Sequence, residues 1–193
     1  MVMLLSVLLS AGPAVDLVEV RETVTREVSR GYGTRASLLK LAMMGVDKAD
    51  EPKVAAVIDE VVKAQLTKER SWKGKTDNDR LTAAFKALEK QGVLAREFFS
   101  MTTTSGRADM KELAATMKPR PSGYVFFTPQ DLDNVFDDKG VFLTFGADSI
   151  DDWAATGARV VAALEKEGLH PTWSGSELEK IWVPLTWRRR LTP

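Results

Sequence analysis

Apolar residues in the first half of the chain recur at the spacing of amphipathic helices. Between Leu17 and Val28 an apolar residue returns every three or four positions, and the pattern stops at Gly31. Such a period places these residues on one face of a helix. A second, shorter helix is predicted after Thr34, which is positioned to cap it, and Gly45 ends it.

Two longer helices are predicted next. The first opens with Asp50 as N-cap and Pro52 in its first turn, and it carries an apolar stripe over four turns. The stripe consists of Val54, Val57, Ile58, Val61, Val62 and Leu66. The second helix is capped by Thr76 or Asp77 and ends at Gly92.

After Gly92 the pattern changes to short β-forming runs separated by short helices. The predicted strands are residues 93–101, 124–128, 141–145, 169–173 and 181–187. A Thr/Ser/Gly turn follows the first strand, and helices are predicted around residues 110–117 and 129–137 and after a cap at Asp151 or Asp152. Pro184 indicates an edge strand or a bulge, because proline donates no ladder hydrogen bond.

These elements predict an α+β fold, in which a helical N-terminal part packs on a small mixed or antiparallel sheet with two or three helices. The chain divides into an apolar N-terminal segment (residues 1–15), a helical region (16–92) and an α+β sheet region (93–193). We expect the last two regions to form one compact unit. Pro119 to Gly123 is the best internal boundary.

The N-terminal segment raises the question of localisation. Its apolar run, residues 2–9, is too short to span a bilayer, and no Lys or Arg precedes it as in a secretory signal. We therefore expect a cytoplasmic protein whose first residues pack on the fold. The alternative is an exported protein from which this segment is cleaved.

Composition excludes several kinds of chemistry. The 193 residues contain no cysteine and one histidine, His170, which excludes thiol catalysis, Cys/His zinc sites, disulfides and His-dependent triads. His170 precedes Pro171 on a predicted strand and is interpreted as structural. The 27 basic residues balance the 27 acidic ones, so no general nucleic-acid or membrane-surface binding is expected.

Several motifs occur together in a recognisable order. Asp77-Asn78-Asp79-Arg80-Leu81 is followed by AAFKALEKQGVLARE, GYVFF-x-x-QD, GVFLTFGA and VVAALEKEGL, and then by W-x-GS, I-x-V and W-x-R. This pattern, from about residue 16 to residue 189, resembles an uncharacterised bacterial family known only as a domain of unknown function. The resemblance implies a shared fold, and it implies no activity.

The chain departs from that family at two places. The resemblance implies a cysteine-rich turn, C-C-x-T-C-G, where this chain has Met101 to Gly106, and a histidine where it has Thr128. Hydroxyl groups are poor replacements for thiolate or imidazole as zinc or iron ligands. This member has therefore either lost a metal or redox site, or belongs to a family whose common role never needed one.

Two groups of polar residues are candidates for a binding site. Asp77, Asp79 and Arg80 at a helix start can hold a cation or clamp a substrate, although carboxylates in a first helical turn also cap free N–H groups. Gln130 and Asp131 follow a predicted strand, where site residues are common, but Asp131 also occupies a capping position.

Tryptophans in loops are a further candidate surface. Trp72 and Trp173 lie beside glycines, and exposed there they would mark a recognition surface. The alternative is that they are buried in the fold. Arg188, Arg189 and Arg190 near the C-terminus can contact phosphates; the alternatives are a solvated end of the chain, or counter-ions for the acidic stretch from Asp131 to Asp152.

The segment from Asp131 to Asp152 is strongly acidic. It holds seven aspartates against one lysine, a net charge of −6, and its spacing does not match a calcium-binding loop. It is either a solvated rim or a face that binds a basic partner. Inhibitors of nucleases often present an acidic face of this kind.

The sequence thus favours a non-enzymatic interaction protein, such as an immunity or antitoxin-type inhibitor or an adaptor, with a protein partner at the acidic segment. The alternatives are an enzyme or small-ligand-binding protein that uses Asp77, Asp79, Arg80, Gln130 and Asp131, or a degenerate family member with no ligand. No cofactor, metal or nucleic acid is expected, and the pattern does not predict an oligomeric state.

Overall fold

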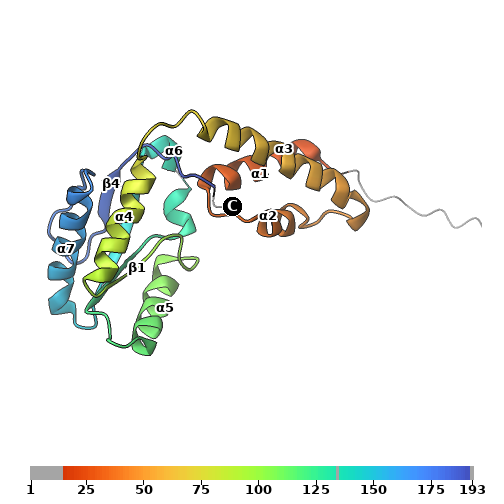
Figure 1. Cartoon of the computed structure of the whole chain (residues 1–193). Coiled ribbons are helices and arrows are strands. Elements are labelled where there is room, and N and C mark those ends of the chain that lie inside the picture. The colour runs from red at the N-terminus through yellow and green to blue at the C-terminus, as the bar shows by residue number, and fades with distance from the viewer. Residues whose placement is uncertain (1–14, 134, 192–193) are drawn as a thin grey trace, which may run out of the picture. The chain divides into compact units, whose positions relative to one another are not determined.

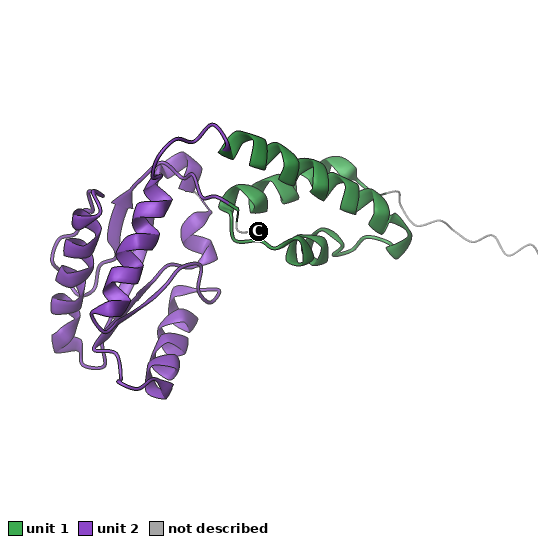
Figure 2. Ribbon diagram, in the orientation of Figure 1, with its two compact units in different colours: residues 1–69, 191–193 green, residues 70–190 purple. Residues whose placement is uncertain are grey.

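The chain folds into two compact units, each with its own core (Figures 1 and 2). The computed structural model describes residues 15–133 and 135–191. Unit 1 comprises the chain up to Glu69 together with Leu191, and unit 2 runs from Arg70 to Arg190. Helices in both units and one mixed sheet in unit 2 confirm the α+β class.

Unit 1 is helical. It contains α1 (Leu17–Arg30), α2 (Arg35–Ala42), the 3₁₀ turn η1 (Lys48–Asp50) and α3 (Glu51–Glu69). Its core is made of residues that the helical period selected: Val20, Val24, Val28, Leu38, Ala42, Val54, Val57, Ile58 and Val61. Leu17 and Leu66, which the same period places on these faces, are exposed. Burying such aliphatic side chains stabilises the fold by about 1.5–3 kcal/mol each.

The caps of unit 1 follow the prediction in part. Thr34 caps α2 as predicted, by accepting a hydrogen bond from the Ser37 N–H at 3.2 Å, and Asp16, for which no capping role was predicted, caps α1. Asp50 is not the capping residue before α3. Asp47 accepts from the Ala49 N–H at 2.8 Å, and the Asp50 carboxylate instead binds Lys53 at 2.6 Å. Asp50 is the last residue of η1 and α3 follows it directly, so the free N–H groups that need a cap lie one turn earlier, at Asp47.

Unit 2 contains the sheet, in the strand order β1-β2-β3-β4. Its helices and strands, in chain order, are α4 (Asp77–Lys90), β1 (Val93–Arg96), α5 (Thr103–Thr116), β2 (Gly123–Phe126), η2 (Pro129–Leu132), α6 (Val135–Asp138), β3 (Gly140–Gly146), η3 (Ile150–Asp152), α7 (Trp153–Lys166) and β4 (Ile181–Pro184). Strands β1 and β2 are parallel and joined through α5, whereas β2–β3 and β3–β4 are antiparallel. Because β4 is an edge strand, Pro184 occupies the kind of position predicted for it.

Helices cover the two faces of the sheet unequally (Figure 1). Helices α4 and α7 pack on each other and on one face of the sheet. On the other face, Met110 and Ala114 of α5 pack against Leu94, Tyr124 and Phe126 of β1 and β2. The α5 face is therefore covered mainly over its parallel half.

The first predicted strand is too long. Strand β1 ends at Arg96, because Phe98 and Ser100 adopt φ angles of 50° and 59°, in the left-handed region that an extended chain cannot use. The Thr/Ser/Gly turn predicted after this strand is the first turn of α5, and Thr102 is its N-cap. A capping box between Thr102 and Ser105 makes this start favourable.

Three further predictions need correction. The helix expected over residues 129–137 is divided into η2 and α6. The Asp152 side chain makes no capping hydrogen bond before α7, and Ser149 caps the preceding η3 turn instead. The strand expected over residues 169–173 is reduced to a single bridge between Thr172 and Trp182.

The units separate in the chain between Glu69 and Arg70, so α4 belongs to unit 2 with the sheet. The expectations for residues 1–14, whether packed or cleaved, lie outside the described residues. Among the residues that the structure describes, no helix is both long and apolar enough to cross a membrane.

Candidate functional site

The Asp77-Asn78-Asp79 run at the start of α4 binds the C-terminal segment of unit 2. The Thr186 N–H donates to Asp77 Oδ2 at 2.9 Å, and the Arg188 N–H donates to Asn78 Oδ1 at 2.6 Å. The Arg190 guanidinium pairs with Asp79. Thr186, Arg188 and Arg190 thus bind successive residues at the start of α4, at the two-residue spacing of an extended chain. We call this arrangement the C-terminal clasp.

Asp79 takes part both in the capping box of α4 and in the C-terminal clasp. It completes the capping box of α4, accepting from the Thr76 N–H at 2.9 Å, and it binds Arg190. Burial raises the pKa of the Asp79 carboxyl. The hydrogen bonds from Thr76 and the hydrogen bond and charge of Arg190 lower the pKa by more than burial raises it, so the pKa lies below its ordinary value. Arg190 also donates to the backbone carbonyls of Trp72 and Gly74, at 3.2 and 3.1 Å.

The lowered pKa predicts how stability depends on pH. A carboxyl whose pKa is depressed by folding stabilises the protein above its unfolded pKa, and this contribution is lost as the pH falls through the folded pKa. We expect wild type to lose stability relative to Asp79→Asn as the pH falls from about 5 to below about 4. The change should stay below about 1 kcal/mol because the two side chains are 36% and 37% exposed and solvent screens their charges. Urea denaturation of both proteins at each pH measures it, and parallel curves would contradict this assignment.

Arg80 and Arg189 are also held by the fold. Arg80 Nη1 donates to the Glu167 carbonyl at 2.7 Å, at the end of α7. Arg189 pairs with Glu97, which accepts a second hydrogen bond from the Thr82 hydroxyl at 2.6 Å. Asp79 and Glu97, outside the acidic segment, are therefore counter-ions of the C-terminal arginines.

The second group of predicted residues lies elsewhere in unit 2. Asp131 accepts from the N–H and the hydroxyl of Thr128, both at 2.8 Å, and pairs with Lys180 at 2.8 Å. Lys180 Nζ also donates to Thr103 Oγ1 at 2.8 Å. The Gln130 side chain is exposed and makes no hydrogen bond to the described residues. No hydrogen bond or ion pair among the described residues joins this group to Asp77, Asp79 or Arg80.

Hydroxyl groups gather where α5 begins. Ser105 Oγ lies 2.8 Å from Ser100 Oγ and 2.9 Å from Thr102 Oγ1. The segment lies at the carboxyl end of β1, beside the parallel strand β2 that leads to Thr128. These hydroxyls satisfy one another and the first turn of α5, which gives them a structural role.

Trp173 is part of the packing between α7 and β3. Its ring meets Phe145 edge-on, with centroids 5.3 Å apart, and its Nε1–H donates to the Ser176 carbonyl at 2.9 Å. A Cβ at Gly157 would lie 2.6 Å from Trp173 Cη2, so the glycine makes room for the ring. Trp72 is half-buried. For Trp173, the contacts therefore favour the alternative that the ring packs within the fold over the alternative that it belongs to a recognition surface.

The acidic segment is not one surface. Asp131 is paired and almost fully buried. Asp133, Asp137 and Asp138 precede β3, whereas Asp148, Asp151 and Asp152 follow it. The seven residues of β3 separate the two clusters by about 20 Å. In the second cluster Asp148 pairs with Arg120 at 2.8 Å.

Exposed aromatic rings lie next to the first of these clusters. Phe142 on β3 is opposite Trp182 on β4, with ring centroids 4.5 Å apart. Phe142 is 43% exposed, and Phe136 in α6 is 48% exposed. The register puts Phe142 and Trp182 on the α5 face of the sheet, beyond its parallel half. We call Phe136, Asp137, Asp138, Phe142 and Trp182 the acidic–aromatic surface.

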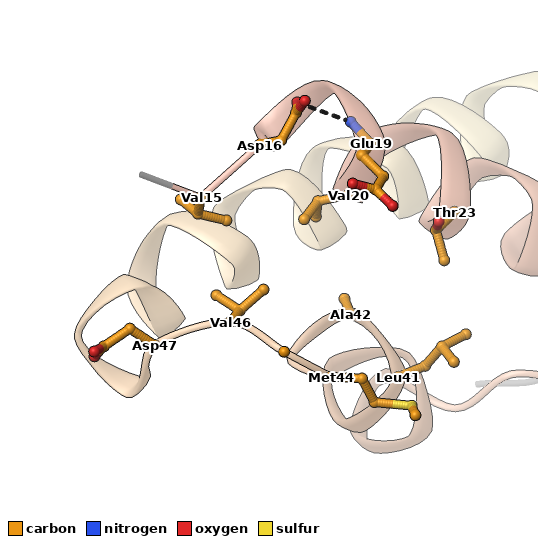
Figure 3. A pocket seen from close by; sticks show the side chains of 11 residues that line it. Val15, Asp16, Glu19, Val20, Thr23, Leu41, Ala42, Met44, Val46 and Asp47 are labelled. Atoms are coloured by element: carbon orange, nitrogen blue, oxygen red, sulfur yellow. Dashed lines mark hydrogen bonds between the residues drawn. The ribbon is translucent and has the colours of Figure 1, made fainter. Parts of the chain in front are cut away.

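Unit 1 has a cavity of about 410 Å³ between the start of α1 and the end of α2 (Figure 3). Its carboxylates are Asp16, Glu19 and Asp47. Asp16 caps α1 and Asp47 caps η1, so two of the three already hold backbone N–H groups. The rest of the wall is mostly apolar, and this chemistry does not select a ligand.

A family model described as "Domain of unknown function (DUF6891)" matches residues 14–191. The chain belongs to this family. The match confirms the uncharacterised domain family suspected from the motif order, and it assigns no activity. No curated protein and no solved structure matches the chain.

In the DUF6891 domain the C-terminal clasp joins the D-x-D-R-L run to the segment that contains the W-x-R run. Thr186, Arg188 and Arg190 of this segment bind Asp77, Asn78 and Asp79. The structure also brings together the two places at which the sequence analysis expects a departure from the family pattern. Thr103, within the turn from Met101 to Gly106, and Thr128 are linked through Lys180 and Asp131.

Two residues of the DUF6891 domain were not predicted from the sequence as parts of a polar site. Lys180 follows a Ser-Gly-Ser turn, and no local motif points to Asp131 as its partner. Asn78 was noted only within the motif, although it is 2% exposed and holds the Arg188 N–H. Within the described residues, no group of three or more His, Asp or Glu side chains is arranged to hold a metal ion.

Proposed function

We propose that the protein is a non-enzymatic interaction protein that binds a basic segment of a partner protein through the acidic–aromatic surface. The contact between the exposed Phe142 and the half-buried Trp182 is the observation that supports this proposal. Aromatic side chains supply much of the binding energy at protein interfaces, and neighbouring charges guide the partner and select it.

The charge next to the rings defines the partner's chemistry. Asp137 and Asp138 are exposed in α6, and Phe142 follows Asp138 by four residues, at most about 14 Å away. Lys139 is the one basic residue between them. A partner segment with Arg or Lys beside apolar side chains complements this arrangement, because Arg also stacks on aromatic rings. An immunity or antitoxin-type inhibitor of a basic protein, or an adaptor, has this kind of surface.

The two acidic clusters allow a matched test. Three tagged proteins are used to capture partners from source cells: wild type, Asp137→Lys/Asp138→Lys and Asp151→Lys/Asp152→Lys. Quantitative mass spectrometry measures what each one recovers. Both double variants change the charge equally, at opposite ends of β3. We expect a basic protein to be recovered by wild type and by the Asp151/Asp152 variant. Its recovery should fall at least about tenfold with the Asp137/Asp138 variant, since close charge pairs at interfaces are worth more than about 1.4 kcal/mol.

A third variant separates aromatic contact from charge. Phe142→Ala should also fail to recover the partner protein, because the aromatic contact is lost. Recovery of the partner by wild type should fall as the salt concentration is raised, because salt screens the charges. Equal recovery by all variants would contradict the proposed surface. Recovery of no stoichiometric protein by wild type would contradict an interaction function, and would favour a degenerate family member.

A further inference from the structure

A second, cationic cavity lies on one face of α4 in unit 2. Its volume is about 300 Å³, at the lower end of the range for small-ligand sites, which is about 300–1,000 Å³. Asn78, Thr82 and Lys86 line it from successive turns of α4, and Arg189 and Arg190 line it from the C-terminal segment. Positions four residues apart share one helical face, so α4 supplies a continuous polar wall.

Cations outnumber carboxylates in the cavity wall. Lys86, Arg189 and Arg190 line it against one carboxylate, Asp79, with Glu97 behind Arg189. Lys86 is exposed and forms no ion pair with the described residues. A guanidinium carries five N–H donors, so an arginine that pairs with one carboxylate can still donate to another acceptor.

Asn78 provides an independent observation. This residue is one of those that line the cavity and is 2% exposed, and its Oδ1 accepts from the Arg188 N–H. Its Nδ2 has no hydrogen-bond partner among the described residues, although buried amide groups are nearly always paired. An acceptor that a ligand brings to this side of the cavity would supply the missing hydrogen-bond partner.

We propose that this cavity binds the phosphate group of a small phosphorylated ligand. A phosphate monoester carries about −1.5 to −2 charges and several acceptor oxygens at neutral pH, which suits three cations and an amide N–H set against one lining carboxylate. A carboxylate ligand carries less charge. The cavity is larger than one phosphate ion needs, and the remaining space accommodates a small organic group.

Lys86 is the residue that tests the site. It is exposed on α4 and takes no part in the clasp, so Lys86→Ala should fold as wild type does. Lys90, one turn further along α4, is exposed and does not line the cavity, and Lys90→Ala is the matched control. Lys86→Arg keeps the charge and should restore binding.

The measurement is a two-dimensional amide NMR titration of the whole protein with glycerol phosphate, inorganic phosphate and sodium chloride at equal ionic strength. We expect saturable shifts of the Asn78 side-chain amide with both phosphates and none with chloride. Lys86→Ala should weaken this binding about tenfold, the effect of one charge-assisted hydrogen bond, and Lys90→Ala should not. Tighter binding of glycerol phosphate identifies an organic monoester, and equal binding identifies free phosphate as the ligand.

Two results would overturn the proposal. One is the absence of a saturable Asn78 shift with either phosphate. The other is an equal loss of binding in Lys86→Ala and Lys90→Ala, which would show only the general effect of net charge. Neither result depends on a protein partner, so the proposed interaction function is tested separately.

Discussion

Replacing Trp187 with alanine is expected to lower the free energy of unfolding of unit 2 by about 3–5 kcal/mol, the usual range for a buried tryptophan. Trp187 is 8% exposed, and its ring meets Phe127 edge-on with centroids 6.2 Å apart. Phe127 in turn packs on Phe85 of α4, with centroids 6.2 Å apart. The ring thus anchors the C-terminal segment in the core while the clasp holds its backbone.

Urea denaturation followed by far-ultraviolet circular dichroism measures this loss. Arg188→Ala is the control, because the side chain is exposed while the backbone N–H that Asn78 accepts is retained. The control should change the free energy of unfolding by no more than about 0.5 kcal/mol. A Trp187→Ala protein as stable as the control would show that the C-terminal segment is not part of the core.

The second large effect is expected at Asp131. Asp131→Ala removes the partner of Lys180 and two hydrogen bonds to Thr128, and should lower the free energy of unfolding by about 2–4 kcal/mol. Its carboxylate is 7% exposed, whereas Lys180 is 31% exposed, so the lysine can regain some water and the loss stays below that of a fully buried pair.

Asp137→Ala is the matched control for Asp131→Ala. Asp137 belongs to the same acidic segment but is exposed, and it should change stability by no more than about 0.5 kcal/mol. The same urea denaturation compares the two proteins. Equally small effects of the two substitutions would mean that Asp131 does not stabilise the fold. Asp131 would then again be a candidate binding residue.

Local signals in the sequence predicted much of the fold. The 3.6-residue period and the caps at Thr34 and Thr76 placed α2 and α4 correctly, because these signals act over one turn of helix. The end of β1 could not be predicted, since Phe98 and Ser100 take left-handed φ angles that residues of their kinds seldom adopt.

The candidate sites depended on contacts between distant parts of the chain. Asp77, Asn78 and Asp79 looked like capping residues or ligands, and their partners lie 109 to 111 residues away. Lys180 lies 49 residues from Asp131. A continuous acidic run in the sequence likewise became two clusters, because a strand of seven residues carries the chain from one end of the sheet to the other.

The central claim is that the acidic–aromatic surface contacts a basic partner. Site-specific photo-crosslinking in source cells tests it most directly, with a photoreactive phenylalanine analogue in place of Phe142 or, as control, in place of the exposed Ala154 at the start of α7. We predict that position 142 crosslinks to one basic protein through an Arg- or Lys-containing segment, and that position 154 does not. Crosslinks of equal yield at both positions, or none at position 142, would contradict the claim.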